Sequence, residues 1–142
     1  MLLLFVAGCT IQKPMAHDPV LWSSRELSQA EIFERLEQAV REEGLPIHKA
    51  NAGDGLIVTD SFDVLTDYCD CGKNLLGADY VGERRGVLRI TVKQGDSTTV
   101  KFDFTTRLKI LANGKFLICD SFGVLEDKLL VQAGLKPKAK TR

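Results

Sequence analysis

The chain has 142 residues, and its 19 basic residues are balanced by 19 acidic ones. This length suffices for one domain with a hydrophobic core and is short for two. The balanced charge gives no indication of a nucleic-acid ligand or of a strongly charged partner. No apolar run approaches the roughly 20 residues that a membrane-spanning helix needs.

The N-terminal segment is an apolar run that leads into a cysteine. Leu2 to Ala7 are apolar, and small residues stand directly before Cys9. Small residues let an extended chain enter a signal peptidase, and the cysteine thiol that follows can accept a diacylglyceryl group. The segment resembles a bacterial lipoprotein signal peptide. The resemblance implies that residues 1–8 are removed and that Cys9 is lipidated.

Lipidation at Cys9 predicts attachment to a membrane, because several acyl chains on one cysteine anchor a protein stably. Thr10 follows the cysteine in place of Asp. By resemblance to the enterobacterial sorting rule, this favours the outer membrane, with the domain facing the periplasm. The periplasmic face of the inner membrane is the alternative. No Lys or Arg precedes the apolar run, so a translation start upstream of Met1 stays open.

Residues 9–24 are predicted to be a flexible tether, because they contain Pro14 and Pro19 and show no apolar periodicity. Trp22 stands near the end of this segment, where it could be the first side chain docked on the domain. The domain is predicted over residues 25–135. Residues 136–142 are predicted to be a basic, disordered tail.

Residues 28–43 carry the clearest helix signals. Ser28 and Glu31 have the spacing of a capping box. Gly44 and Pro46 mark the helix end. One apolar stripe at helical spacing comprises Ile32, Phe33, Leu36, Ala39 and Val40. The segment is therefore predicted to be a helix with one buried face.

Two short apolar runs, Ile47 to Ala50 and Leu56 to Thr59, flank a turn at Asp54-Gly55 and predict a β-hairpin. His48 lies in the first run, where a lone histidine is typical of a surface strand. Asp63 to Gly86 is the least regular part of the folded region. A loop of this length is usually functional or mobile.

The second half of the sequence alternates between apolar and polar residues, which predicts a three-stranded antiparallel meander. A three-residue loop at 95–97 would place apolar residues opposite one another, whereas a two-residue loop would place them opposite lysines. The preferred register pairs Val92 with Val100, Ile90 with Phe102 and Leu88 with Phe104.

Asn113-Gly114 is the strongest hairpin signal in the chain. A type I′ turn at these two residues predicts that Ile110 lies opposite Leu117 and Leu108 opposite Cys119. Cys119 is then expected to point into the core.

The other face of the meander is polar and mostly basic. We interpret it as an ordinary solvated sheet face, and a basic docking surface is the alternative. Its residues are Arg89, Thr91, Lys93, Lys101, Asp103, Thr105, Arg107 and Lys109.

Ser121 is predicted to cap a second helix that ends at Gly134. The predicted order is helix, hairpin, long loop, three-stranded meander and helix. This order predicts an α+β fold in which an antiparallel sheet, made of the hairpin and the meander, carries the N-terminal and C-terminal helices on one face.

Two short motifs resemble the helix-grip domains of BamC-like lipoproteins. They are the hairpin segment Gly55-Leu-Ile-Val-Thr59 and the strand exit Ser121-Phe-Gly-Val-Leu-Glu126. The resemblance implies a helix-grip fold and an accessory role in the assembly of outer-membrane proteins. Only one such domain fits this chain, where the family has two. No binding residue is carried over from the family.

Three cysteines remain after Cys9, and an oxidising periplasm would let two of them form a disulfide. We expect Cys119 to pair with Cys69 or with Cys71, and the sequence leaves open which one. The alternative is a metal site made of these three cysteines and His48. Zinc sites more often show two cysteines separated by two residues than by one.

The sequence shows no nucleophile elbow, phosphate-binding loop or paired-histidine metal motif. We therefore predict no catalytic residue and no cofactor. The preferred function is a non-enzymatic docking or accessory module in envelope assembly, with outer-membrane assembly proteins as partners. The alternative is a small-ligand or metal-binding protein that uses the loop from Cys69 to Gly86.

Overall fold

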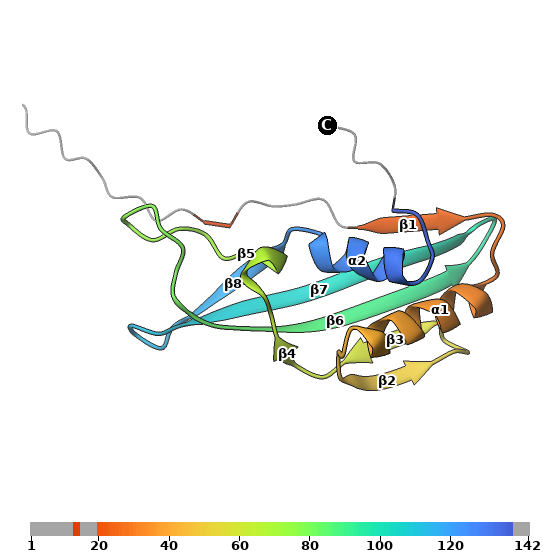
Figure 1. Cartoon of the computed structure of the whole chain (residues 1–142), viewed down its shortest axis with the longest axis horizontal. Coiled ribbons are helices and arrows are strands. Elements are labelled where there is room, and N and C mark those ends of the chain that lie inside the picture. The colour runs from red at the N-terminus through yellow and green to blue at the C-terminus, as the bar shows by residue number, and fades with distance from the viewer. Residues whose placement is uncertain (1–12, 15–19, 138–142) are drawn as a thin grey trace, which may run out of the picture.

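A computed structural model describes residues 13–14 and 20–137 (Figure 1). The predicted lipidation site Cys9, the signal peptide and residues 138–142 of the predicted tail lie outside the described residues. The elements in chain order are β1 (Leu21–Ser24), α1 (Gln29–Glu42), β2 (Ile47–Asn51), β3 (Leu56–Thr59), β4 (Phe62–Asp63), the 3₁₀ turn η1 (Thr66–Tyr68), β5 (Cys69–Asp70), β6 (Gly82–Gln94), β7 (Thr98–Ile110), β8 (Phe116–Ser121) and α2 (Val124–Gln132). Neither α-helix within the described residues has the length and hydrophobicity needed to cross a membrane.

The strands form one antiparallel sheet in the order β2-β3-β6-β7-β8-β5. In addition, β1 pairs with β7 and β4 pairs with β6. Both helices lie over the same side of this sheet (Figure 1). The predicted α+β fold, with a hairpin, a three-stranded meander and two helices on one face, is confirmed.

The capping box at the start of α1 forms as predicted. The Ser28 hydroxyl accepts a hydrogen bond from the backbone N–H of Glu31 at 3.2 Å, and the Glu31 carboxylate accepts one from the N–H of Ser28 at 3.4 Å. Gly44 ends the helix with a φ of 78°, which lets the N–H of Leu45 reach the carbonyl of Val40 at 3.2 Å.

The first hairpin of the meander also has the predicted register. Val92 lies opposite Val100, and Gln94 lies opposite Thr98 across the three-residue loop. However, β6 begins at Gly82, so the C-terminal part of the segment predicted to be irregular is strand. A Cβ at Gly82 would lie 2.0 Å from the carbonyl oxygen of Lys109. This glycine therefore marks a close approach of two strands.

The predicted register of the second hairpin is wrong by two residues. Leu108 lies opposite Leu117, and Thr106 lies opposite Cys119. A type I′ turn needs a positive φ at both central residues, but within the described residues only glycines have one, and here it is Gly114 with 69°. The N–H of Ile110 bonds to the carbonyl of Lys115 at 2.8 Å, which closes a longer loop. Because side chains alternate along a strand, a register shift of two residues keeps Cys119 on the core side, as predicted.

The predicted N-cap of the second helix is also corrected. The N-cap of α2 is Gly123, which has a φ of 81°, and no side chain caps the helix directly. The Ser121 hydroxyl instead accepts a hydrogen bond from the N–H of Gly123 at 3.0 Å and donates one to Glu126 at 2.7 Å. Ser121 thus orders the turn into the helix from outside it. The helix end at Gly134 is as predicted.

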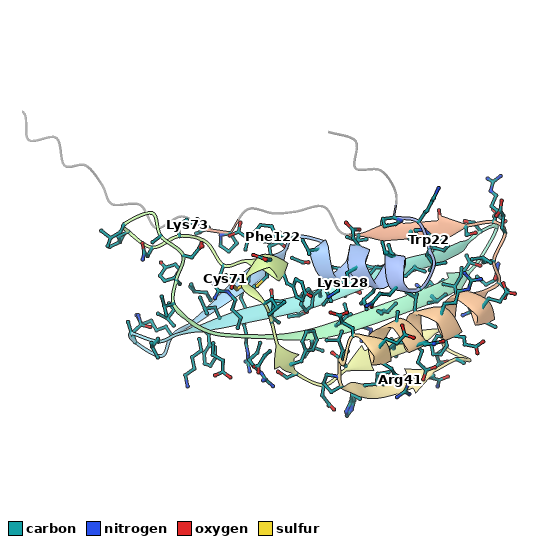
Figure 2. The ribbon with its side chains drawn as sticks, in the orientation of Figure 1. Trp22, Arg41, Cys71, Lys73, Phe122 and Lys128 are labelled. Carbon is teal, nitrogen blue, oxygen red and sulfur yellow. A yellow bond between two sulfur atoms is a disulfide. The ribbon has the colours of Figure 1, made fainter. Side chains whose placement is uncertain are left out.

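The predicted tether and tail both overlap the folded domain. Residues 21–24 form β1, which pairs with the start of β7, and Trp22 lies opposite Val100. The Trp22 side chain is 8 % exposed, and its Nε1 donates a hydrogen bond to the backbone carbonyl of Lys136 at 2.8 Å (Figure 2). The domain therefore includes β1 at its start and Lys136 at its end.

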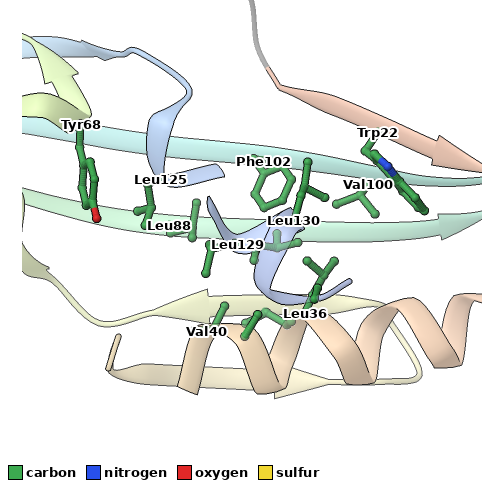
Figure 3. Close-up of a cluster of buried hydrophobic side chains, with 14 of the residues drawn as sticks. Trp22, Leu36, Val40, Tyr68, Leu88, Val100, Phe102, Leu125, Leu129 and Leu130 are labelled. Atoms are coloured by element: carbon green, nitrogen blue, oxygen red, sulfur yellow. The ribbon is translucent and has the colours of Figure 1, made fainter. Parts of the chain in front are cut away.

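The core lies between the two helices and the inner face of the sheet (Figure 3). Leu36 of α1, Leu129 of α2 and Leu88 of β6 are fully buried. The C-terminal end of α1 is also joined to α2, because Glu43 accepts hydrogen bonds from Lys128 at 2.6 Å and from Gln132 at 3.0 Å. This packing leaves the outer face of the sheet uncovered by the helices.

The turn between β2 and β3 depends on Gly55. A Cβ at this position would lie 2.0 Å from the carbonyl oxygen of Val92, and the φ of 63° disfavours any other residue. We expect Gly55→Ala to lower the free energy of unfolding by about 2–3 kcal/mol. Gly44→Ala is the matched control, because Gly44 also has a positive φ but a Cβ there meets nothing within 4 Å. Urea denaturation measures both variants, and equal decreases in the free energy of unfolding would contradict the predicted clash.

Candidate functional site

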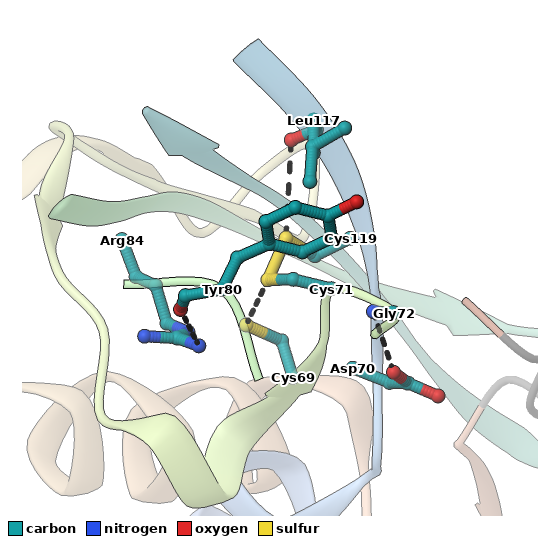
Figure 4. Close-up of a disulfide and its surroundings, with 8 residues drawn as sticks. All are labelled: Cys69, Asp70, Cys71, Gly72, Tyr80, Arg84, Leu117 and Cys119. Carbon is teal, nitrogen blue, oxygen red and sulfur yellow. Dashed lines mark hydrogen bonds between the residues drawn. A yellow bond between two sulfur atoms is a disulfide. The ribbon is translucent and has the colours of Figure 1, made fainter. Parts of the chain in front are cut away.

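Three cysteines gather where β5 meets β8 (Figure 4). The two strands are antiparallel, with Cys69 opposite Ser121 and Asp70 opposite Asp120. One further step in this register brings Cys71 opposite Cys119. The structure joins these two residues in a disulfide, which spans 48 residues of sequence. The register thus selects Cys71 over Cys69, the choice that the sequence left open.

Cys69 is the third member of this sulfur cluster, and it is a free thiol. Cys69 and Cys71 are two residues apart in extended chain, so their side chains point to the same side. Their sulfur atoms are 3.7 Å apart, and the three sulfurs all lie within 4.8 Å of one another. The cysteines are only 3 %, 5 % and 8 % exposed for Cys69, Cys71 and Cys119.

The inner face of the sheet supplies the polar groups around the cluster. Arg84 of β6 donates a hydrogen bond from Nη2 to the carbonyl of Tyr80 at 3.3 Å, and its guanidinium lies beside Cys69 (Figure 4). Burial raises the pKa of the Cys69 thiol above its ordinary value, while the Thr106 hydroxyl and the positive charge of Arg84 act in the opposite direction. Burial dominates, so Cys69 is protonated at neutral pH.

We expect the Cys69 thiol to react slowly with iodoacetamide at pH 8 while the protein is folded. Only the thiolate reacts. In the folded protein the Cys69 thiolate is rarer than in the unfolded chain, and the surrounding residues cover its sulfur. Unfolding at the same pH should raise the alkylation rate, because it exposes the sulfur and removes the burial that raises the pKa of the thiol. Peptide mass mapping of Cys69 measures this rate. Fast labelling of the folded protein would contradict the burial.

The same thiol predicts a pH dependence of stability. The folded protein holds the Cys69 proton more tightly than the unfolded chain does. The free energy of unfolding should therefore fall as the pH rises above the ordinary thiol pKa of about 8.5. A Cys69→Ala variant should lose this part of the pH dependence.

A cavity of about 350 Å³ opens beside Cys69. Its lining mixes both signs of charge and includes the Lys73–Asp79 ion pair. The lining residues are Thr66, Asp67, Cys69, Asp70, Lys73, Asp79, Arg84 and Phe122. Of the three cysteines, Cys69 is the one that faces this cavity.

The structure does not bring His48 to the cysteines, so the metal set of three cysteines and His48, which the sequence offered as an alternative, does not form. His48 lies on β2, and β2 and β5 are at opposite ends of the strand order. Its Nδ1 is 3.0 Å from a carboxylate oxygen of Asp60, and both side chains are well exposed. The metal-ligand geometry among the described residues comprises only the three cysteines.

A second feature lies on the outer face of the sheet, and we call it the β8 face. It comprises Phe116 and Ile118 of β8 with their cross-strand partners on β7, Lys109 and Arg107. Phe116 is 56 % exposed and Ile118 is 74 % exposed. The Arg107 guanidinium lies 5.0 Å from the centroid of the Phe116 ring, and the Lys109 ammonium lies 6.0 Å from it. The β8 face is thus apolar and cationic at once.

The β8 face continues into two loops at the same end of the molecule (Figure 1). The N–H of Leu111 donates a hydrogen bond to the carbonyl of Val81 at 2.9 Å, which joins the loop before β6 to the loop after β7. Val81, Leu111 and Leu76 are all exposed. Apolar side chains thus gather at one end of the domain.

The β8 face was not predicted, although its signal is present in the sequence. Phe116 and Ile118 alternate with Leu117 and Cys119 along one strand. If Cys119 points inward, the other two must point outward. Arg84 was missed for a different reason, because it lay in the segment predicted to be irregular.

No family model matches the chain, and the comparison with curated proteins found no match. Among solved structures, the chain is similar to a TBP-like protein from Parabacteroides distasonis ATCC 8503. That match has 16 % sequence identity and a TM-score of 0.37, and it covers 87 % of this chain and 85 % of the other.

Proposed function

We propose that this protein is a lipid-anchored envelope protein that docks other proteins of the outer membrane without catalysing a reaction. The N-terminal motif that ends at Cys9 supports the anchor, and the short motifs similar to BamC-like domains support the setting. The observation that carries the docking role is the β8 face. A soluble domain usually covers an exposed aromatic and a β-branched apolar side chain that stand together, unless they form a contact surface.

The charge of the β8 face indicates the chemistry of the partner. Among the described residues, neither Arg107 nor Lys109 forms a salt bridge. Both cations are therefore available to carboxylates of a partner, next to the apolar surface of Phe116 and Ile118. The occupant that fits is a protein segment that presents apolar side chains flanked by acidic ones.

Site-specific photocrosslinking in intact cells tests this proposal. A photoreactive residue at Ile118 should form crosslinks to outer-membrane assembly proteins. The matched control is the same residue at Leu21, which is also apolar and 55 % exposed but pairs with the other end of β7. Arg107→Glu together with Lys109→Glu should abolish the crosslinks from Ile118. Equal crosslinking from both positions, or crosslinking to lipid alone, would overturn the proposal.

The anchor is tested separately. Metabolic labelling with an alkyne fatty acid should label the chain, and Cys9→Ala should abolish the label and release the protein from membranes. If the label is absent, the anchor is wrong, whatever the result for the β8 face.

A further inference from the structure

We propose that reduction of the Cys71–Cys119 disulfide turns the sulfur cluster into a three-thiolate site for a soft metal ion, with monovalent copper as the ion that fits best. The proposal rests on the arrangement of the three sulfurs and does not depend on the β8 face. It assigns a role to Cys69, a buried free thiol that lies next to the disulfide but is not part of it.

The three sulfurs form a triangle. Exchange of the disulfide onto Cys69 would require the attacking sulfur to approach along the axis of the bond. Since a disulfide bond is about 2.05 Å long, a linear array would place the sulfurs of Cys69 and Cys119 about 5.7 Å apart. They lie within 4.8 Å instead. The arrangement therefore does not suit direct exchange, and it does suit three ligands around one centre.

The spacing matches what a bound ion needs. Three sulfurs that each lie about 2.3 Å from one metal ion are about 4 Å apart in a trigonal site. Cys69 and Cys71 are already 3.7 Å apart. On reduction, only the Cys71 and Cys119 sulfurs have to separate, by about 2 Å, which rotation about the side-chain bonds can supply.

The ligand set indicates which ion fits. Thiolates suit both monovalent copper and zinc, but structural zinc sites have four ligands, so a set of three thiolates favours copper. Among the described residues, no histidine, carboxylate or further cysteine completes the set as a fourth ligand. The burial of the three cysteines limits the access of water, and the positive charge of Arg84 offsets part of the negative charge of the thiolates.

The chemistry has two balanced steps. A dithiol reductant of the thioredoxin type donates two electrons: one of its thiolates attacks the disulfide, its second thiol resolves the mixed disulfide, and the reductant leaves oxidised. Cys71 and Cys119 are then free thiols. Binding of the ion forms three metal–sulfur bonds and releases the protons of the three thiols.

Anaerobic titration of the full chain tests the proposal, in a Cys9→Ser background so that Cys9 contributes no thiol. The reduced protein should bind one monovalent copper ion per chain in competition with a chromogenic chelator. X-ray absorption should show three sulfur ligands at about 2.3 Å. The oxidised protein should bind none.

Cys69→Ser is the decisive variant, because it keeps the disulfide in the oxidised protein and removes only the third ligand. After reduction, it should bind copper at least roughly 100-fold more weakly than the parent chain. His48→Ala, matched as a change outside the cluster, should bind as the parent does. Equal binding by Cys69→Ser and the parent would overturn the proposal, as would tighter binding of zinc than of copper.

Loss of the disulfide could itself unfold the chain, so folding is followed by circular dichroism. Copper should raise the thermal midpoint of the reduced parent, or restore its folded spectrum, because an ion that binds only the folded state stabilises it. Reduced Cys69→Ser should show no such gain. If copper fails to stabilise or refold the reduced parent, the site does not exist.

Discussion

Trp22→Ala should lower the free energy of unfolding by about 3–5 kcal/mol, although Trp22 lies in a segment that the sequence predicts to be a tether. The indole is buried against the start of β7, and its Nε1 is bonded to the Lys136 carbonyl at 2.8 Å. The substitution leaves a cavity and removes the partner of a backbone carbonyl. It should also loosen β1 and the segment after α2 together.

Leu21→Ala is the matched control for this prediction. Leu21 belongs to the same strand but is 55 % exposed, so its loss should change the free energy of unfolding by less than about 1 kcal/mol. Trp22 is the one tryptophan in the chain, so unfolding in urea has to be followed by circular dichroism. A similar small change for both variants would show that β1 does not stabilise the domain.

Removing the disulfide through Cys71→Ala and Cys119→Ala together should lower the free energy of unfolding by about 4 kcal/mol. The bridge closes a loop of 48 residues, and constraining a loop of that length in the unfolded chain has roughly this effect in the chain-entropy model. Trp22 fluorescence can follow the unfolding, because Trp22 lies on β1, far from the cluster along the strands (Figure 2).

Cys69→Ala is the control for the double substitution. It removes one buried sulfur from the same cluster and leaves the disulfide intact, so the loss should be about 1 kcal/mol. A double variant that is no less stable than Cys69→Ala would show that the bridge contributes little to folding.

Local patterns predicted the elements whose signals lie within one stretch of sequence. The capping box fixed the start of α1 at Ser28, and the alternation of apolar residues fixed the pairing of Val92 with Val100. Each of these features depends on residues that are neighbours in the chain or in one hairpin, so periodicity and turn length suffice to find them.

Features that depend on distant segments could not be predicted in this way. The pairing of Cys71 with Cys119 follows from β5, a strand of two residues that is too short to show any periodicity. The same is true of β1, whose four residues are positioned by pairing with β7 and by the hydrogen bond from Trp22 to Lys136. The prediction from Asn113-Gly114 failed for another reason, because only Gly114 of the two residues adopts the positive φ that a type I′ turn needs at both, and the strands are joined by a longer loop.

The length of β7 sets the distance between β1 and the β8 face. Trp22 pairs near one end of this strand at Val100, and Phe116 pairs near the other end at Lys109. Nine residues of extended strand separate these points by about 30 Å. Because β6 pairs with β7 along its whole length, the two hydrogen-bonded strands keep this distance fixed. The domain can therefore act as a stiff spacer that presents the β8 face about 30 Å from the point where the chain enters the fold.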